Sequence, residues 1–125
     1  MYSKIQDYIQ GKRLLITGAS GYLASNLAQS LKNFPCKVRR LTRKSNLSPL
    51  KGVAVFEDIK GDIYDVSVWD RVMEEVDAVF HFAAQTSVYI ADKDPFSDYQ
   101  ANVLPMLLML ESCKNNGRQP DILFA

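Results

Sequence analysis

The feature that most constrains the fold is the stretch LLITGASGYLASNLAQSL, which covers residues 14–31. Apolar and β-branched residues predict a strand over Lys12–Thr17, which leads through Gly18 and Gly21 straight into a helix expected over about Tyr22–Asn33. So short a turn directs the unpaired N–H groups of the helix beyond the edge of a sheet, where they can bind an anion. The stretch therefore predicts a phosphate site as well as two elements.

Three small residues have expected roles at this turn. Gly18 allows the tight turn, Gly21 lets the backbone approach a pyrophosphate without an intervening Cβ, and Ala24 keeps the helix close to the strand. Two glycines three apart would alone be weak evidence, because a strand-to-helix turn that binds nothing can also hold them. A second strand predicted at Lys37–Thr42 completes a β–α–β unit, and this context strengthens the phosphate-site interpretation.

The rest of the chain continues to alternate strands and helices. The predicted elements are a polar loop at Arg43–Lys51, a short strand within Val53–Lys60, a helix over about Asp65–Val76, a strand at Asp77–Ala83, a long helical region from Asp94–Pro95 to about Gly117 that Pro105 interrupts or kinks, and the start of a strand at Ile122–Ala125. Continuous apolar strands between helices indicate a parallel sheet with helices on both faces. We predict a doubly wound, Rossmann-type α/β fold that stops after the start of its fifth strand.

Composition limits the class of protein. A chain of 125 residues with 47% hydrophobic content is expected to form one domain. Its formal net charge of +1 provides no basic field for nucleic acid, and Cys36 and Cys113 form neither a metal-ligand motif nor a disulfide framework. No run approaches the roughly 18 apolar residues of a membrane span, and the N-terminus has no signal-peptide core. We therefore expect a cytoplasmic protein with no metal, nucleic-acid or membrane partner.

Four short segments carry a resemblance to a known family. They are TGASGYLA at 17–24, GDIYD at 61–65, HFAA at 81–84 followed by Gln85, and Asp94–Pro95 with NVLP at 102–105. In this order they resemble the TGxxGxxG, GDxxD, HxAA and DPxxxxxxNVxG segments of the extended short-chain dehydrogenase/reductases, in particular the nucleotide-sugar epimerase/dehydratase group. Ala24 replaces the third glycine of the first segment, and Pro105 replaces the glycine of the last.

The resemblance implies a binding site for a nicotinamide dinucleotide. It implies that the phosphate loop holds the pyrophosphate, that Asp62 meets the adenine amino group while Ile63 packs by the ring, and that small residues let the cofactor lie on the fourth strand end. The implied residues are Gly18, Ser20, Gly21, Tyr22, Leu23, Asp62, Ile63, Phe82, Ala83 and Ala84. Taken singly, Asp62 could be a turn residue, and His81 is better explained as a structural histidine bonded to the backbone than as a general base.

The second strand bears on the choice between NAD and NADP. A carboxylate about 20 residues past the glycines usually holds an adenine ribose with a free 2′-hydroxyl, and here Thr42 occupies that position. Residues 37–46 contain no acid, whereas Arg39, Arg40, Arg43 and Lys44 are basic. These residues favour a 2′-phosphate and hence NADP, with NAD as the alternative. Arg43 is the predicted phosphate contact, unless the loop is merely basic and solvated.

The catalytic residues of the resembled family are not where this sequence would need them. That family uses a Tyr-x-x-x-Lys pair on a later helix, with a nearby Ser or Thr, for proton transfer. Tyr8–Lys12 and Tyr89–Lys93 have this spacing, but both precede the strand that should come before the catalytic helix. We predict no catalytic residue in this chain.

We interpret residues 1–125 as the N-terminal, NAD(P)-binding part of a longer enzyme that transfers hydride to and from its cofactor on a nucleotide sugar. The chain alone is then expected to be inactive. The alternatives are a non-catalytic NADP-binding sensor or regulatory module, and an extended-family reductase of a non-sugar substrate. An isolated chain would expose the sheet edge at Ile122–Ala125 and apolar helix faces, so aggregation or association into a homodimer through that surface is expected.

Overall fold

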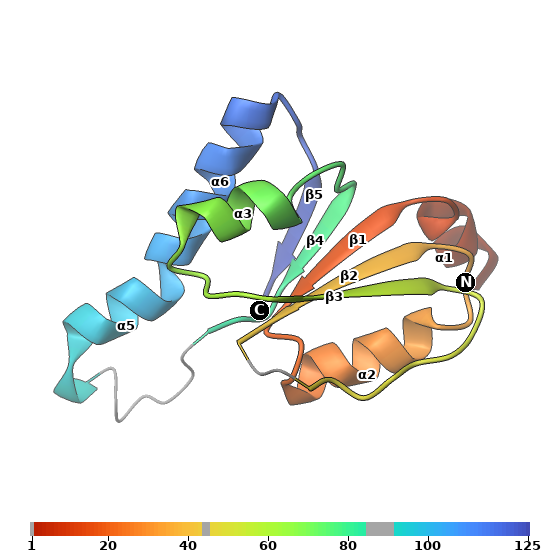
Figure 1. Ribbon diagram of the computed structural model, residues 1–125, viewed down its shortest axis with the longest axis horizontal. Coiled ribbons are helices and arrows are strands. Elements are labelled where there is room, and N and C mark those ends of the chain that lie inside the picture. The colour runs from red at the N-terminus through yellow and green to blue at the C-terminus, as the bar shows by residue number, and fades with distance from the viewer. Residues whose placement is uncertain (1, 44–45, 85–91) are drawn as a thin grey trace.

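The computed structural model describes residues 2–43, 46–84 and 92–125, which form one parallel sheet with helices on both faces (Figure 1). The five strands are β1 Arg13–Thr17, β2 Lys37–Thr42, β3 Val55–Lys60, β4 Ala78–His81 and β5 Asp121–Phe124, and their spatial order is β3-β2-β1-β4-β5. The helices are α1 Tyr2–Ile9, α2 Tyr22–Leu31, α3 Val66–Val72, α5 Pro95–Asn102 and α6 Leu104–Asn116. The predicted doubly wound fold is confirmed.

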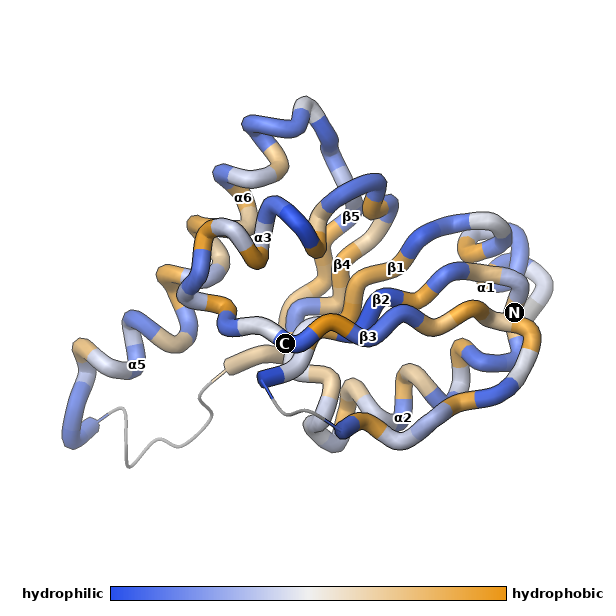
Figure 2. The backbone as a smooth tube through the Cα atoms, viewed as in Figure 1, coloured by the Kyte–Doolittle hydropathy of each residue, from blue (hydrophilic) through white to orange (hydrophobic). Residues whose placement is uncertain are grey.

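Alternate residues of the central strands supply two separate cores. The core beneath α1 and α2 contains Ile9, Leu14, Ile16, Ala24, Ala28 and Val38. The core beneath α3 and α6 contains Leu15, Leu41, Trp69, Val72, Val79 and Met109. Figure 2 shows hydrophobic residues along much of β1 and β4, in the middle of the sheet. Successive side chains of a strand point to opposite faces, so both faces of β1 are apolar and both are covered.

The helical layers differ from the prediction in one additional helix, α1, and in the ends of α2 and α3. Helix α1 was not predicted; it is short and amphipathic and contributes Ile9 to the core. Helix α2 ends at Leu31, before the predicted Asn33. Helix α3 ends at Val72, before the predicted Val76, because a turn follows in which Glu75 takes a positive φ of 58°. That turn leads the chain into β4.

The predicted interruption in the long helical region is confirmed. Helix α5 begins after Asp94, whose side chain accepts a hydrogen bond from the Ser97 N–H at 3.1 Å. It ends at Asn102, and α6 starts at Leu104 with Pro105 in its first turn, where a proline needs no N–H partner. None of the helices in the described ranges is long and apolar enough to cross a membrane.

The order of the strands positions the site. The chain moves outward from β1 to β2 and β3, and then returns to the other side of β1 to form β4 and β5. The connections at the carboxyl ends of β1 and β4 therefore leave in opposite directions. In open α/β sheets a crevice forms at such a reversal, and ligands bind there.

Candidate functional site

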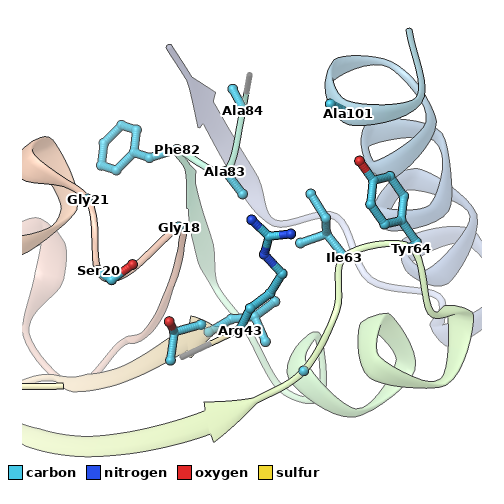
Figure 3. A pocket seen from close by; sticks show the side chains of 13 residues that line it. Gly18, Ser20, Gly21, Arg43, Ile63, Tyr64, Phe82, Ala83, Ala84 and Ala101 are labelled. Atoms are coloured by element: carbon cyan, nitrogen blue, oxygen red, sulfur yellow. The ribbon is translucent and has the colours of Figure 1, made fainter. Parts of the chain in front are cut away.

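A cavity of about 710 Å³ lies at the carboxyl ends of the strands. Its lining residues come from the ends of β1 to β4, from the segments that follow them and from α5. They are Gly18, Ser20, Gly21, Leu41, Thr42, Arg43, Gly61, Ile63, Tyr64, Phe82, Ala83, Ala84 and Ala101. Figure 3 shows the glycine turn on one side of this cavity and Tyr64 with Ala101 on the other.

The turn between β1 and α2 requires a glycine at position 18 for two reasons. Gly18 has a φ of +62°, which L-residues with side chains rarely adopt. A Cβ on Gly18 would also lie 2.8 Å from the Ala83 nitrogen and 2.9 Å from the Phe82 carbonyl carbon. The loop therefore lies in backbone contact with the end of β4, and the floor of the cavity there is almost bare main chain.

The first turn of α2 opens on this floor without a side-chain cap. Gly21 is the N-cap, its N–H donates to the Gly18 carbonyl at 2.9 Å, and no side chain in the described ranges caps the helix. A Cβ on Gly21 would lie 3.2 Å from that carbonyl oxygen. The amides of the first turn carry partial positive charge and can accept an anion. Tyr22 and Leu23 are 83% and 58% exposed and do not line the cavity, so their contribution would come from these amides.

A buried hydroxyl joins β1 to β4 directly beneath the loop. The Thr17 Oγ1 accepts hydrogen bonds from the N–H groups of Phe82 and Ala83, both at 3.1 Å. Since these donors use its lone pairs, its own proton points to the His81 Nδ1, 2.8 Å away. His81 is buried beside the Trp69 ring, and burial lowers its pKa. His81 is thus structural, but its partner here is the Thr17 hydroxyl and not the backbone that the sequence analysis expected.

The segment from Gly61 to Asp65 is held in place by hydrogen bonds. The Gly61 N–H donates to the Thr42 carbonyl at 3.0 Å, and the Trp69 indole N–H donates to the Ile63 carbonyl at 2.8 Å. The Asp62 Oδ1 accepts from the Tyr64 N–H at 3.0 Å, so this carboxylate makes the turn contact that was one of its two alternatives. Asp62 is exposed and does not line the cavity, whereas Ile63 and Tyr64 do.

Two of the predicted basic residues do not reach the cavity. Arg39 is buried, with its Nε 2.9 Å from Glu57 and its Nη1 donating to the carbonyls of Val72 and Glu74. Arg40, buried on the opposite face, makes a bidentate ion pair with Asp58 at 2.6 and 2.8 Å. Arg39 and Arg40, counted in the sequence analysis among the basic residues that favour a 2′-phosphate, instead pair with the acids of β3 directly across from them.

Arg43 does line the cavity. It follows β2, and its guanidinium extends into the cavity between Ala83 and Ile63 (Figure 3). Among the lining residues in the described ranges, Arg43 alone is charged. Lys44, like Gln85 and Tyr89, lies outside the residues that the structure describes.

The Tyr8–Lys12 pair is at the opposite end of the strands, beside the start of β1. The Tyr8 hydroxyl donates to the Asp121 carboxylate, and this hydrogen bond raises the pKa of Tyr8. The Lys12 Nζ lies 3.9 Å from the centre of the Tyr8 ring. A catalytic tyrosine needs a lowered pKa and a place at the cavity, and Tyr8 has neither.

Most of the predicted site residues come together around the cavity. Those that line it are Gly18, Ser20, Gly21, Thr42, Arg43, Ile63, Phe82, Ala83 and Ala84, while Tyr22, Leu23 and Asp62 do not. The sequence analysis missed Leu41, Gly61, Tyr64 and Ala101. The motif GDIYD contains Gly61 and Tyr64, so the sequence analysis identified this segment but assigned no role to these two residues. Ala101 belongs to α5, and no local signal connects it to the strand ends.

Comparison with known proteins gave consistent matches. The sequence profile of the NAD dependent epimerase/dehydratase family matches residues 14–125. The trifunctional UDP-glucose 4,6-dehydratase/UDP-4-keto-6-deoxy-D-glucose 3,5-epimerase/UDP-4-keto-L-rhamnose-reductase RHM3 of Arabidopsis thaliana is 33% identical over 117 residues, which are 86% of this chain and 18% of that protein. This chain therefore spans less than a fifth of that relative.

Two solved structures extend the comparison to the fold. The epimerase Mth375 of Methanothermobacter thermautotrophicus superimposes with a TM-score of 0.79 at 31% identity, over 98% of this chain and 37% of that one. The UDP-glucose 4-epimerase of Bifidobacterium longum, in complex with NAD+ and UDP, gives a TM-score of 0.77 at 25% identity, over 91% of this chain and 36% of that one. In both cases the matched region is a little over a third of the solved chain.

Proposed function

Since the chain belongs to the NAD dependent epimerase/dehydratase family, we propose that its cavity binds a nicotinamide dinucleotide for an enzyme that acts on a nucleotide sugar. The observation that carries this proposal is the glycine turn. Gly18 and Gly21 bring bare backbone and the uncapped first turn of α2 to the wall of a cavity of about 710 Å³. Backbone amides in this arrangement suit a pyrophosphate.

In this proposal each part of the lining has a role. The amides from Ser20 to Leu23 would hold the pyrophosphate, and Phe82, Ala83 and Ala84 would carry the nicotinamide half along the end of β4. Ile63 would pack beside the adenine. The Asp62 Oδ1 already accepts from the Tyr64 N–H, so an adenine amino group would meet Oδ2. When bound, the nicotinamide supplies the hydride chemistry, and the protein supplies position and electrostatics.

We further propose that NADP is preferred to NAD. The family is described as NAD dependent and the Bifidobacterium longum epimerase was solved with NAD+, so this preference would be a property of this chain. Its support is that Arg43 is charged and that no carboxylate lines the cavity in the described ranges. A 2′-phosphate would receive charge-assisted hydrogen bonds from the guanidinium, whereas a 2′-hydroxyl would find no carboxylate acceptor.

The nucleotide sugar is proposed from the relatives. The Arabidopsis thaliana protein and the Bifidobacterium longum epimerase are both enzymes of UDP-sugars by name, which favours a sugar nucleotide over the sensor and the non-sugar reductase. No Tyr–Lys pair lines the cavity within the part of the chain that the structure describes. We therefore propose that residues 1–125 bind the dinucleotide without turning substrate over, as the cofactor-binding part of a longer enzyme.

Calorimetric titration of the chain with NADP and NAD tests the proposal. Arg43→Ala should lower the affinity for NADP by roughly tenfold or more, since a hydrogen bond to a charged group contributes about 1.5–3 kcal/mol, and should leave the affinity for NAD nearly unchanged. Arg71→Ala is the matched control, because Arg71 is exposed on α3 away from the cavity. Equal loss of affinity for both dinucleotides in Arg43→Ala would contradict the NADP preference. Binding of neither dinucleotide by the unchanged chain would contradict the proposed function itself.

A further inference from the structure

The side of the cavity opposite the glycine turn is formed by an aromatic residue that no motif singles out. We propose that the Tyr64 ring, with the Ala101 methyl group beside it, is the face against which the adenine ring of the dinucleotide packs. This inference rests on the proposed function and adds Tyr64 to the residues that would contact the dinucleotide. It concerns the base, whereas the Arg43 proposal concerns the ribose phosphate.

Tyr64 is positioned before any ligand arrives. Its own N–H is held by the Asp62 Oδ1 at 3.0 Å, and the Asp65 N–H closes the same turn on the Asp62 carbonyl at 3.0 Å. The preceding Ile63 carbonyl accepts from the buried Trp69 indole at 2.8 Å. These bonds fix the main chain on both sides of the ring, so little backbone entropy remains to be lost on binding.

The surroundings of the ring suit a flat, uncharged base. Tyr64 is 44% exposed although it lines a cavity, and its neighbours in the lining are Ile63 and Ala101. Figure 3 places the Tyr64 ring next to Ala101, on the far side of the Arg43 guanidinium from Gly18. Among the described lining residues the charge thus lies in the middle of the cavity, and those at its outer end, Ile63, Tyr64 and Ala101, are apolar or aromatic. Bases stack on aromatic rings of this kind with little sequence preference.

Ala101 contributes through its small size. It lies on α5, a helix with no buried residue, which places a methyl group at the edge of the cavity beside a phenol. A larger side chain there would occupy the volume that the base needs, while leaving an exposed helix intact. Ala101 therefore gives a second way to test the same contact without touching Tyr64.

The experiment is a titration of the chain and its variants with NADP and with ADP, which contains the adenine but no nicotinamide. Tyr64→Ala should weaken both ligands by the same factor, about 5- to 140-fold for a lost base–aromatic contact, and Tyr64→Phe should bind both within about twofold of the unchanged chain. Tyr99→Ala is the matched control, since Tyr99 is 43% exposed, is also a tyrosine and does not line the cavity. Trp69 is the single tryptophan, so its fluorescence reports both folding and binding near Ile63.

The outcomes separate the two proposals. If the unchanged chain binds neither NADP nor NAD, the proposed function fails. If it binds a dinucleotide but Tyr64→Ala keeps full affinity, or loses affinity for NADP and not for ADP, the Tyr64 inference is overturned. Should Tyr64→Ala fail to fold, Ala101→Leu decides: a comparable loss for NADP and ADP supports the inference, and unchanged affinity refutes it.

Discussion

At the scale of single residues, one hydroxyl organises the junction under the cofactor cavity. The Thr17 hydroxyl accepts hydrogen bonds from two main-chain N–H groups at the end of β4 and donates its own hydrogen bond to the His81 Nδ1. This arrangement requires a neutral imidazole, because a protonated ring would present N–H at Nδ1 where it must accept. The backbone that lines the cavity at Phe82 and Ala83 is therefore coupled to the protonation state of His81.

This coupling predicts a pH dependence of stability. Burial lowers the pKa of folded His81 below its ordinary value of 6.5, so the unfolded chain takes up the proton first as the pH falls. The free energy of unfolding should then decrease as the pH falls below about 6.5, by up to about 1.4 kcal/mol per pH unit. Urea titrations between pH 7.5 and pH 5 measure it, and His81→Gln should flatten the slope.

Asp65 and Asp94 titrate in a lower pH range than His81, so they do not account for a change in stability between pH 5 and pH 6.5. Hydrogen bonds from Ser67 and Ser97 lower the pKa of these two carboxyl groups below the ordinary 3.8. Their stabilisation is present above that value and is lost only as the pH falls through their still lower folded pKa values. A slope between pH 5 and 6.5 that survives in His81→Gln would therefore disprove the assignment to His81.

The role of a residue could be predicted from the sequence where only one residue type fits the position. At Gly18 both the positive φ and the contact with β4 exclude other residues, so the motif identified its role. Arg39 and Arg40 were misassigned because their partners belong to another strand. Which acid lies opposite which arginine depends on the register between β2 and β3, and the sequence alone does not give that register.

At the scale of elements, the β–α–β unit was predictable and α1 was not. Strand β1 is a buried apolar run, β2 is a short buried strand, and an amphipathic helix separates them, so each signal is local. Helix α1 is short and amphipathic, with Ile5, Tyr8 and Ile9 at helical spacing, and it depends on contacts far along the chain, such as Ile9 in the α2-side core and Tyr8 on Asp121. Helices this short form through tertiary packing, which a local pattern does not contain.

The turn between β1 and α2 gives an element-scale prediction with a close control. Gly18 and Gly11 have similar φ values of +62° and +73°, but only at Gly18 would a Cβ meet the backbone of β4, since nothing lies within 4 Å of one at Gly11. Gly11→Ala should lower the free energy of unfolding by about 1–2 kcal/mol for the backbone strain. Gly18→Ala should lower it by a further 1–3 kcal/mol or so and abolish dinucleotide binding, as measured by urea unfolding and calorimetry. Equal losses of stability in the two variants would contradict the contact.

At the scale of the whole molecule, the two edges of the sheet differ in character. The edge strand β3 carries Glu57, Asp58 and Lys60, whereas β5 at the other edge ends in Leu123 and Phe124, which are 53% and 69% exposed. A charged edge resists pairing with another chain, and an exposed apolar edge invites it. Self-association is thus expected through β5.

Sedimentation velocity over a range of concentrations tests this expectation. The unchanged chain should associate increasingly with concentration, and Leu123→Lys should shift it toward monomer because a lysine on an edge strand disfavours pairing. Val53→Lys is the matched control, since Val53 is an exposed apolar residue outside β5, with 63% of its surface accessible. A monomer at every concentration, or equal effects of the two substitutions, would contradict association through β5.

The two buried arginines of β2 have a consequence for how the outer strand is aligned during folding. Arg39 and Arg40 lie directly opposite Glu57 and Asp58, and the two ion pairs point to opposite faces of the sheet. Sliding β3 by one residue would turn each acid to the other face, so that only one carboxylate would still lie opposite a guanidinium group. Sliding it by two would place Arg39 and Arg40 opposite Val55 and Phe56, or opposite Ile59 and Lys60, and opposite no carboxylate. Both ion pairs can form together only in the observed register, so these adjacent arginines favour a single alignment of the outermost strand.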